Sequence, residues 1–241
     1  GVRGKMGRII KAALQTADDL EYVGGLVRAD PSGDEFDDIA KLLAAKRPHA
    51  VVDFTHYPQS LAIAKSAIEA GSRPVIGTSG YGPADVAELR ALCERTKTGC
   101  VFAPNFAVGA VLMMKFAAEA ARYYPAVEIV ELHESGKKDA PSGTAMATAQ
   151  RLAAVKTYDR PATAMFKADG ARGAEIGGVG VHSLRLPGIV SHQEVLFGAG
   201  GETLRIVHDS SSRESFIPGV LRAVRAARDL DRFIEGLEPL L

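Results

Sequence analysis

The stretch His49-Ala-Val-Val-Asp-Phe54 is a short run of mainly apolar residues, and it predicts a buried strand. Residues 59–69, which follow it, predict a helix, and Pro74-Val-Ile-Gly77 predicts the next strand. A helix over 84–96 and a strand over 100–103 continue the same order. Short strands that alternate with helices of about ten residues are typical of parallel βαβ units. The sequence therefore predicts an α/β fold with a doubly wound, Rossmann-like sheet.

The region before this stretch extends the alternation with a strand over 20–27 and a helix over 37–45. The first residues, Gly1-Val-Arg-Gly4-Lys-Met-Gly7, form a glycine-rich turn that leads into a helix over 8–14. Glycines at such a turn let the backbone approach a pyrophosphate, which then lies on the helix N-terminus. The strand expected before the turn is not within the sequence, so we expect a trimmed or incomplete N-terminus.

In a doubly wound sheet the ligand lies at the carboxyl ends of the strands. Those ends fall at 53–55, 77–79 and 103–106 in this sequence, and turn chemistry alone would be the structural alternative. Together with the glycine turn they predict a dinucleotide site. The expected cofactor-binding residues are Gly1, Arg3, Gly4, Lys5, Met6, Arg28, Gly77, Thr78, Ser79, Ala103, Pro104, Asn105 and Phe106.

The charges near the second strand bear on which dinucleotide is bound. Val27 stands about where a fold that prefers NAD has an acid for the ribose hydroxyl. Arg28 follows directly, and Arg3 and Lys5 lie in the glycine turn. Three cations without an acid favour the 2′-phosphate of NADPH, with NADH also accepted. Three solvated surface cations, or Asp30 bound to the ribose, remain the alternatives.

The pattern changes after residue 105. A long helix over 108–123 carries Met113, Met114 and Phe116, which we expect in a core. A loop over 160–180 and strands over 180–186, 193–197 and 202–208 predict an antiparallel region of α+β type. The sequence thus predicts a dinucleotide-binding domain of residues 1–104, completed by the C-terminal helical segment 213–241, and a substrate-binding domain of residues 105–212.

The second domain contains Glu131-Leu-His-Glu-Ser-Gly-Lys-Lys-Asp-Ala-Pro-Ser-Gly-Thr-Ala145. An alternating strand over 127–133 places His133 before a loop with Lys137 and Lys138. The loop ends at Ser142, a suitable N-cap for the Ala-rich helix that follows. A proton donor, a fixed positive charge and free backbone N–H groups together suit a small carboxylated substrate. A solvated loop before a capped helix would show the same spacing.

This stretch resembles the signature of the 4-hydroxy-tetrahydrodipicolinate reductase (dihydrodipicolinate reductase) family, Glu-x-His-His-x-x-Lys-x-Asp-Ala-Pro-Ser-Gly-Thr-Ala. The matching positions are Glu131, His133, Lys137, Asp139 and residues 140–145. Glu134 departs from the pattern, because the family usually has a second histidine there. The resemblance runs nearly end to end, since it also covers residues 53–55, 77–78, 103–107, 192–198 and 215–219.

The resemblance implies NAD(P)H-dependent reduction of 4-hydroxy-tetrahydrodipicolinate to tetrahydrodipicolinate in diaminopimelate and lysine biosynthesis. It implies His133 as general acid and Lys137 as second proton donor, with one substrate carboxylate on Lys137, Ser142, Gly143 and Thr144. A cytoplasmic homotetramer, formed through the open sheet of the second domain, is implied as well. We expect Glu134 to pair with Lys137 or Lys138 rather than to repel the substrate.

Two other functions remain open at this point. One is a reductase of the same fold for another unsaturated or imino dicarboxylate. The other is a non-catalytic NADPH-binding protein, which would need neither His133 nor Lys137.

The composition narrows the class of protein further. The 241 residues include 29 basic and 29 acidic side chains, so nothing indicates a nucleic-acid or membrane-surface partner. Cys93 and Cys100 are isolated thiols, which fit a reducing compartment. No His, Cys or Asp spacing matches a metal site, and no apolar run is long enough for a membrane span.

Overall fold

A computed structural model describes residues 1–241, which divide into two compact units. Unit 1 contains Gly1–Val108 and Arg213–Leu241. Unit 2 contains Gly109–Ser212. Unit 1 is therefore built from both ends of the chain, whereas unit 2 is one continuous segment.

Unit 1 is an α/β unit. Its helices are α1 (Lys5–Thr16), α2 (Ile39–Lys46), α3 (Gln59–Glu69), α4 (Pro83–Thr96) and α7 (Ile217–Ala227), with the 3-10 turns η1 (Arg213–Phe216) and η2 (Glu238–Leu240). Its strands are β1 (Gly25–Leu26), β2 (Glu35–Phe36), β3 (Ala50–Asp53), β4 (Arg73–Ile76), β5 (Cys100–Phe102) and β11 (Phe233–Glu235).

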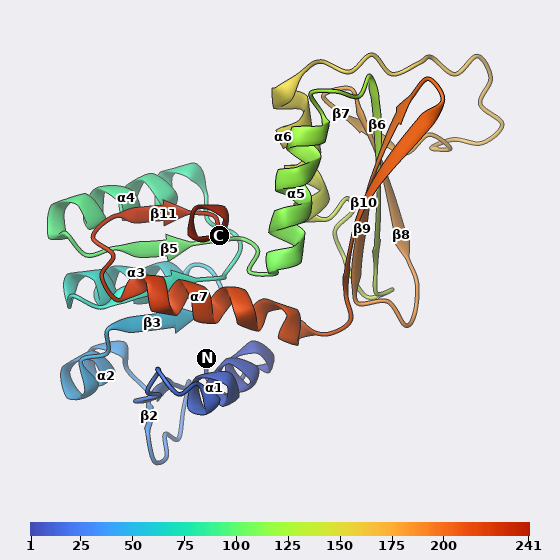
Figure 1. The fold of residues 1–241 in the computed structure, drawn as a ribbon. Coiled ribbons are helices and arrows are strands. Elements are labelled where there is room, and N and C mark those ends of the chain that lie inside the picture. Colours follow the sequence, from blue (N-terminus) through green and yellow to red (C-terminus); the bar gives the residue numbers. More distant parts are fainter. The chain divides into compact units, whose positions relative to one another are not determined.

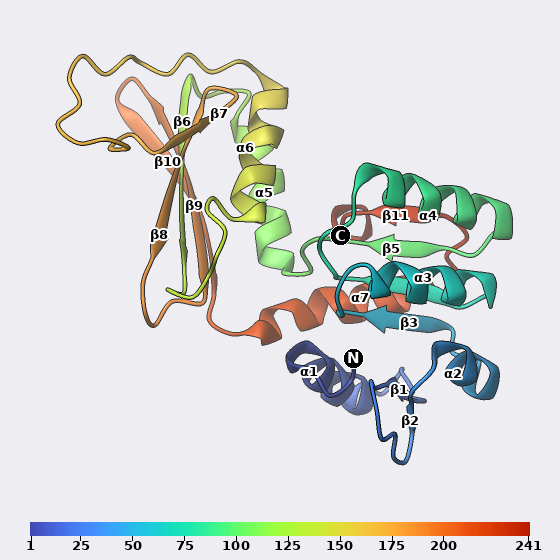
Figure 2. The same ribbon diagram turned by 180° about the vertical axis from the view of Figure 1, so that it is seen from behind.

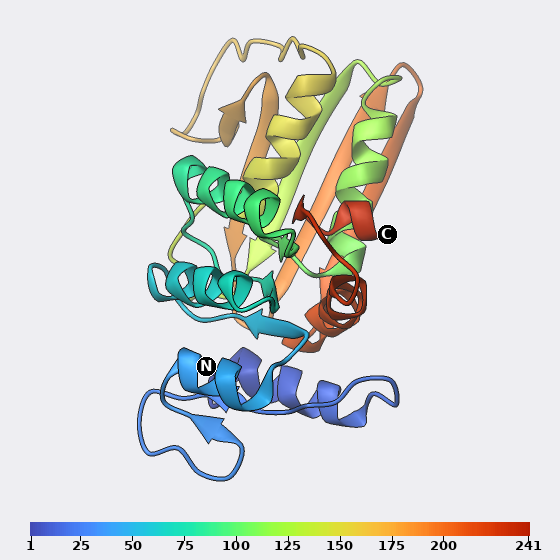
Figure 3. The same cartoon turned by 90° about the vertical axis from the view of Figure 1, so that its left-hand side faces the viewer.

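The main sheet of unit 1 is parallel and has the order β11-β5-β4-β3, while β1 and β2 form a separate parallel pair. Figure 3 shows α3 and α4 on one face of the main sheet and the red helix α7 on the other. Ile76, Cys100 and Phe233 pack in one buried cluster with Ile68 of α3 and Leu89 of α4. Helices on both faces of a parallel sheet confirm the predicted doubly wound α/β class.

Two strand predictions in unit 1 need correction. The strand expected over 20–27 is reduced to Gly25–Leu26, because its one hydrogen-bonded partner strand, Glu35–Phe36, is only two residues long. The sequence did not predict Phe233–Glu235 as a strand, since three residues are too few to show a period. It forms on the free edge of β5, with Ile234 opposite Val101.

Unit 2 is an α+β unit with one five-stranded sheet in the order β10-β9-β6-β8-β7. The strands are β6 (Ala126–His133), β7 (Ala174–Ile176), β8 (Val179–Arg185), β9 (Ser191–Ala199) and β10 (Glu202–Ser210). The helices α5 (Val108–Ala120) and α6 (Gly143–Val155) lie on one face of this sheet (Figures 1 and 2).

The sheet of unit 2 is mixed, which corrects the prediction of an antiparallel region. β9 is antiparallel to β6 and β10, but β8 is parallel to β6. β8 and β9 follow each other in sequence, yet β6 lies between them. β6 is the central strand, and its residues Val127, Ile129 and Glu131 are buried. The connection over 186–190 crosses the end of β6, where the Leu186 N–H donates to the His133 carbonyl at 3.0 Å.

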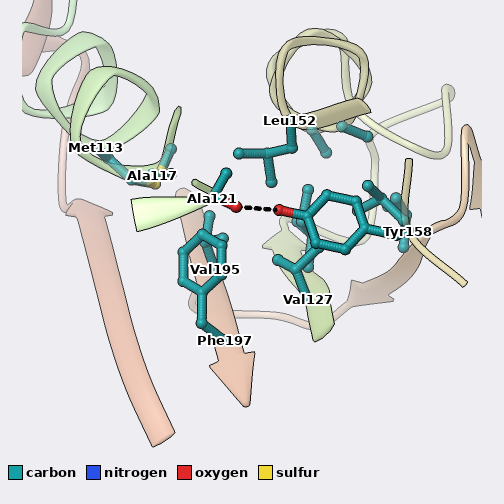
Figure 4. Close-up of a cluster of buried hydrophobic side chains, with 13 residues drawn as sticks. Met113, Ala117, Ala121, Val127, Leu152, Tyr158, Val195 and Phe197 are labelled. Carbon is teal, nitrogen blue, oxygen red and sulfur yellow. Dashed lines mark hydrogen bonds between the residues drawn. The ribbon is translucent and has the colours of Figure 1, made fainter. Parts of the chain in front are cut away.

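The core of unit 2 lies between the helices and the sheet (Figure 4). Met113 and Ala117 of α5 pack there with Phe197 of β9, and the Tyr158 hydroxyl donates to the Ala121 carbonyl at 3.2 Å. Phe116 is 54% exposed, so its expected place in the core is wrong. The buried positions of α5 recur every three or four residues, and position 116 falls outside that stripe.

The opposite face of this sheet is not covered by a helix within unit 2. Glu128 lies there and binds Arg160, Arg172 and His182, which holds the segment between α6 and β7 against the strands. Val207 on β10 is 49% exposed. No helix of either unit has the length and apolar character that a membrane crossing requires.

Candidate functional site

Three polar residues lie next to one another where the neighbouring strands β6, β8 and β9 of the unit 2 sheet end or begin. His133 is the last residue of β6, and its sheet partners are Arg185 at the end of β8 and Ser191 at the start of β9. The Ser191 Oγ lies 3.2 Å from the His133 Nε2. Because β6 and β8 are parallel and β9 is antiparallel, two strand ends and one strand start coincide here.

The carboxylate of Glu131 contacts several residues of this cluster. Its side chain is fully buried, and its Oε2 lies 2.5 Å from the His133 Nδ1. The Arg185 guanidinium donates to both carboxylate oxygens, at 2.9 and 3.0 Å. The Ser142 backbone N–H donates to Oε1 at 3.2 Å. The carboxylate therefore joins the histidine, the arginine and the start of α6.

The charge of Glu131 follows from these contacts. Burial alone would raise the pKa of the Glu131 carboxyl, but hydrogen bonds from Arg185, Ser183 and His133 and the positive charge nearby outweigh it. The pKa of Glu131 consequently lies below its ordinary value, and the group is an anion at neutral pH.

The N-terminus of α6 lies directly beyond the loop. Ser142 is the N-cap, and its Oγ accepts from the Ala145 N–H at 3.2 Å. A side chain at Gly143 would meet open space, so the first turn is accessible. Backbone N–H groups at such a turn attract carboxylates. Ser142, Gly143 and Thr144 therefore form a possible cradle for an anion.

The lysine of the loop has a different partner from the one expected. The Lys137 Nζ lies 2.7 Å from the Asp139 Oδ1, and the hydrogen bond from Lys137 lowers the pKa of Asp139. Glu134 is exposed and makes no ion pair, so the expected pairing with Lys137 or Lys138 is wrong. The turn brings only the backbones of Glu134 and Lys137 together, at 3.1 Å, and leaves Asp139 within reach of the ammonium group.

Unit 1 contains a pocket of about 430 Å³ at the glycine turn. It is lined by Gly1, Arg3, Gly4, residues 26–30, residues 54–56 and Gln59. The N-cap of α1 is Gly4, which offers no side-chain acceptor to the first N–H groups. A Cβ at Gly7 would lie 2.2 Å from the Gly1 carbonyl oxygen, so the tight turn requires glycine. These features fit a pyrophosphate on the helix N-terminus.

The other predicted cofactor residues do not line this pocket. Lys5 and Met6 begin α1, and Ser79 and Pro104 are exposed on loops. Thr78 and Ala103 are buried, and Asn105 accepts from the Ala107 N–H at 2.8 Å. The ring centres of Phe54 and Phe106 lie 5.4 Å apart, and a Cβ at Gly77 would strike Phe54 at 2.2 Å. Gly77 and Phe106 therefore pack behind Phe54 in the pocket wall.

One of the three expected free cations is paired. Arg3 binds Glu35 at 2.5 Å and also donates to the Asp30 carbonyl at 2.8 Å. The hydrogen bond from Arg3 lowers the pKa of Glu35 to about 2. The acid that pairs with Arg3 is thus Glu35 of β2, not a residue at the end of β1. The order of residues in the sequence did not indicate that Glu35 lies near the glycine turn. Arg28 remains exposed at the pocket.

Comparison with known sequences follows the same two units. Family models described as "Dihydrodipicolinate reductase, N-terminus" and "Dihydrodipicolinate reductase, C-terminus" match residues 1–106 and 109–241. The chain belongs to the dihydrodipicolinate reductase family. This confirms the resemblance found in the sequence.

Relatives within the dihydrodipicolinate reductase family are similar over their whole length. Two proteins named 4-hydroxy-tetrahydrodipicolinate reductase, from Moorella thermoacetica and Coxiella burnetii strain Dugway 5J108-111, are each 46% identical, and the matches cover all of this chain and 96% and 97% of theirs. A solved structure of dipicolinate-bound dihydrodipicolinate reductase from Paenisporosarcina sp. TG-14 is 37% identical with a TM-score of 0.93, covering all of this chain and 97% of that one.

Sequence reasoning missed Arg185, Ser191 and Glu35 as members of these two clusters. Each becomes a neighbour only through strand pairing, opposite His133 for the first two and opposite Gly25 for the third. The signature of the dihydrodipicolinate reductase family contains none of them. A correct strand order would have been needed to find them.

Proposed function

We propose that this chain reduces 4-hydroxy-tetrahydrodipicolinate to tetrahydrodipicolinate with NAD(P)H, in diaminopimelate and lysine biosynthesis. The observation that carries the proposal is His133, held by Glu131 at the end of β6 within the family signature and next to the α6 N-terminus. Unit 1 is the dinucleotide-binding domain, and unit 2 is the substrate-binding and tetramerisation domain. The two cysteines are free and buried, which suits a cytoplasmic location.

The residues of unit 2 divide the chemistry between them. A nicotinamide cofactor, which the glycine turn and Arg28 of unit 1 would hold, would supply hydride to the heterocycle once the 4-hydroxyl has left as water. His133 protonates the resulting enamine, and Lys137 is a second proton donor. The backbone N–H groups at Ser142, Gly143 and Thr144 bind one carboxylate, and Lys137 offsets the charge of the dianion. Asp139 pairs with Lys137 and holds its ammonium group in place before the substrate binds.

The direct test is a spectrophotometric assay of NADPH oxidation with freshly prepared 4-hydroxy-tetrahydrodipicolinate. Oxidation that requires both enzyme and substrate is expected. No oxidation with this substrate, but turnover of another unsaturated or imino dicarboxylate, would favour the second candidate. The observation that supports this second candidate is Glu134, which stands where the family usually has histidine.

We also propose that unit 2 forms a homotetramer through the uncovered face of its sheet. Val207 on β10 and Leu184 on β8 are 49% and 39% exposed, and both are apolar residues on strands. Exposed apolar side chains on a sheet face without a helix over it are typical of an interface between subunits. The tetramer of the resembled family supports the same assignment.

Arg28→Ala is expected to weaken NADPH binding by about 1.5–3 kcal/mol, the range for a hydrogen bond to a charged group, while NADH binding is unchanged. The reason is that the Arg28 guanidinium is exposed at the pocket and forms no ion pair with a carboxylate. Titration of both cofactors by fluorescence or calorimetry measures the two affinities. Arg95→Ala, an exposed arginine on α4, is the control. Equal losses for both cofactors would show that Arg28 does not bind the 2′-phosphate.

Glu134→His is expected to lower the KM for the dicarboxylate about 2- to 5-fold with little change in kcat. Glu134 is exposed and unpaired, so its charge opposes the approaching dianion without holding Lys137. Glu134→Gln separates the loss of charge from the gain of an imidazole. Steady-state kinetics of both variants measures the effect. A fall in kcat at constant KM would instead show that Glu134 supports the lysine.

A further inference from the structure

We propose that Glu131 is a positioning residue that fixes the proton-donating nitrogen of His133 and ties this acid to the carboxylate cradle at the start of α6. The inference rests on the proposed function for its kinetic part. Its structural part concerns the hydrogen-bonded form of one imidazole ring and needs no substrate.

The first step is the state of the carboxylate. Glu131 is fully buried and accepts twice from Arg185 and once from the Ser142 N–H, and its Oε2 lies 2.5 Å from the His133 Nδ1. A carboxyl group that already accepts from three fixed donors stays ionised, because protonation would place its own hydrogen against one of them. The Arg185 charge offsets the cost of burying the anion. An ionised carboxylate can only accept hydrogen bonds.

The second step is the form of the imidazole. Since Glu131 only accepts, the His133 Nδ1 must carry a hydrogen in the 2.5 Å contact. The neutral ring therefore keeps its lone pair on Nε2, which lies 3.2 Å from the Ser191 Oγ. Nε2 is the nitrogen that gains and loses a proton during turnover, and Nδ1 does not exchange.

The third step is the proton balance. In the cationic ring, the Nε2–H bond breaks and its electron pair stays on nitrogen. The enamine carbon of the substrate forms the new C–H bond with its own electron pair. The ring returns to the neutral form with hydrogen on Nδ1, and Nε2 is reloaded by one proton taken up from the bulk solvent in each turnover. No oxidant or further reactant is needed for this step.

Of the charged groups near His133, Glu131 is the one that contacts the ring. Arg185 on β8 binds Glu131 and reaches the Asp139 carbonyl at 2.7 Å, so it also fixes the loop. Lys137 and Asp139 in that loop pair with each other, and Ser191 on β9 is uncharged. Glu131 is thus the one carboxylate in direct contact with the ring, and its oxygens also fix Ser142.

The test compares Glu131→Gln with the wild type by ¹⁵N NMR of the histidine side chains, at a pH where they are neutral. The wild type is expected to show His133 with hydrogen on Nδ1, identified by the signal lost in His133→Asn. Glutamine can donate to Nδ1, so the variant should lose that form. Its kcat should fall about 10²–10³-fold, within the range of a misplaced general acid, with a smaller change in KM. Its pH–rate profile should also change, because the ring no longer contacts a carboxylate.

The controls separate positioning from structural support. Glu128→Gln removes another carboxylate of β6 that also binds two arginines and a histidine, and it should keep the wild-type kcat. Glu131→Asp keeps the charge but shortens the reach, and it should restore part of the kcat and the pH profile. The NMR readout is made on the folded fraction, so a stability defect in Glu131→Gln does not decide it.

Each outcome decides the inference. A His133 with hydrogen on Nε2 in the wild type would overturn it, and so would a Glu131→Gln variant with an unchanged ring form and pH profile. If the wild type does not reduce 4-hydroxy-tetrahydrodipicolinate, the proposed function fails, while the NMR comparison still decides the role of Glu131.

Discussion

His133→Ala is expected to lower kcat about 10²–10⁴-fold, the usual contribution of a general acid. Lys137→Ala is expected to lower kcat by a factor in the same range. Binding of NADPH should be almost unchanged, because neither residue lines the pocket at the glycine turn. Steady-state kinetics with 4-hydroxy-tetrahydrodipicolinate and a separate titration of NADPH measure the two effects.

The matched control for this result is His182→Ala. His182 lies on β8 and contacts the Glu128 carboxylate at 2.8 Å, so it is also a histidine paired with a glutamate in the same sheet. It is not at the signature loop, and its loss should leave kcat near the wild-type value. Loss of NADPH binding with turnover preserved in His133→Ala would disprove the catalytic assignment.

Arg185→Ala is expected to lower the free energy of unfolding by about 3–5 kcal/mol at neutral pH, because it leaves the buried Glu131 anion without its cation. Urea denaturation followed by circular dichroism measures the change. Arg205→Ala is the control, since Arg205 pairs with Glu194 at 3.5 Å while 65% of its side chain is exposed. An exposed pair of this kind contributes at most about 1 kcal/mol.

The effect of Arg185→Ala should depend on pH. In the wild type the pKa of Glu131 lies below its ordinary value of 4.5. Its stabilising contribution is therefore complete above that value and is lost as the pH falls through the lowered pKa. In the variant, burial without Arg185 raises the pKa of Glu131, so the carboxyl is protonated at a higher pH than in the wild type. The stability difference should shrink towards acid pH, and a constant difference would contradict the ion-pair explanation.

The fold was predictable wherever the chain carries a local period. The helix over 59–69 is confirmed at both ends, and the strands near 50–53, 73–76 and 100–102 are confirmed within one residue at each end. β2 and β11 were not predictable, because strands of two and three residues form only when a partner edge is available. The position of β6 between β8 and β9 also depends on which strands pair across the sheet, which no local pattern records.

Some residues of the candidate site could also be predicted from the sequence, and others could not. His133, Lys137 and Ser142 lie within ten residues of one another, so a single stretch suggested all three. Arg185 and Ser191 reach His133 only through the register of β8 and β9. The choice of Asp139 over Glu134 as the partner of Lys137 was also beyond sequence spacing, since it depends on the direction in which the turn sends each side chain. The roles of these residues in catalysis stay predictions.

The pairing of β11 with β5 has a consequence for how the chain matures on the ribosome. Unit 2 is complete once Ser212 has been synthesised, whereas unit 1 still lacks α7 and the strand Phe233–Glu235 at that moment. The usual order, in which the N-terminal domain folds first, is thus reversed here. Until the last strand arrives, the nascent protein has an unpaired edge on β5, and such edges promote aggregation. An mRNA on which translation stops shortly before Phe233 would therefore yield a complete unit 2 attached to an incomplete, aggregation-prone unit 1.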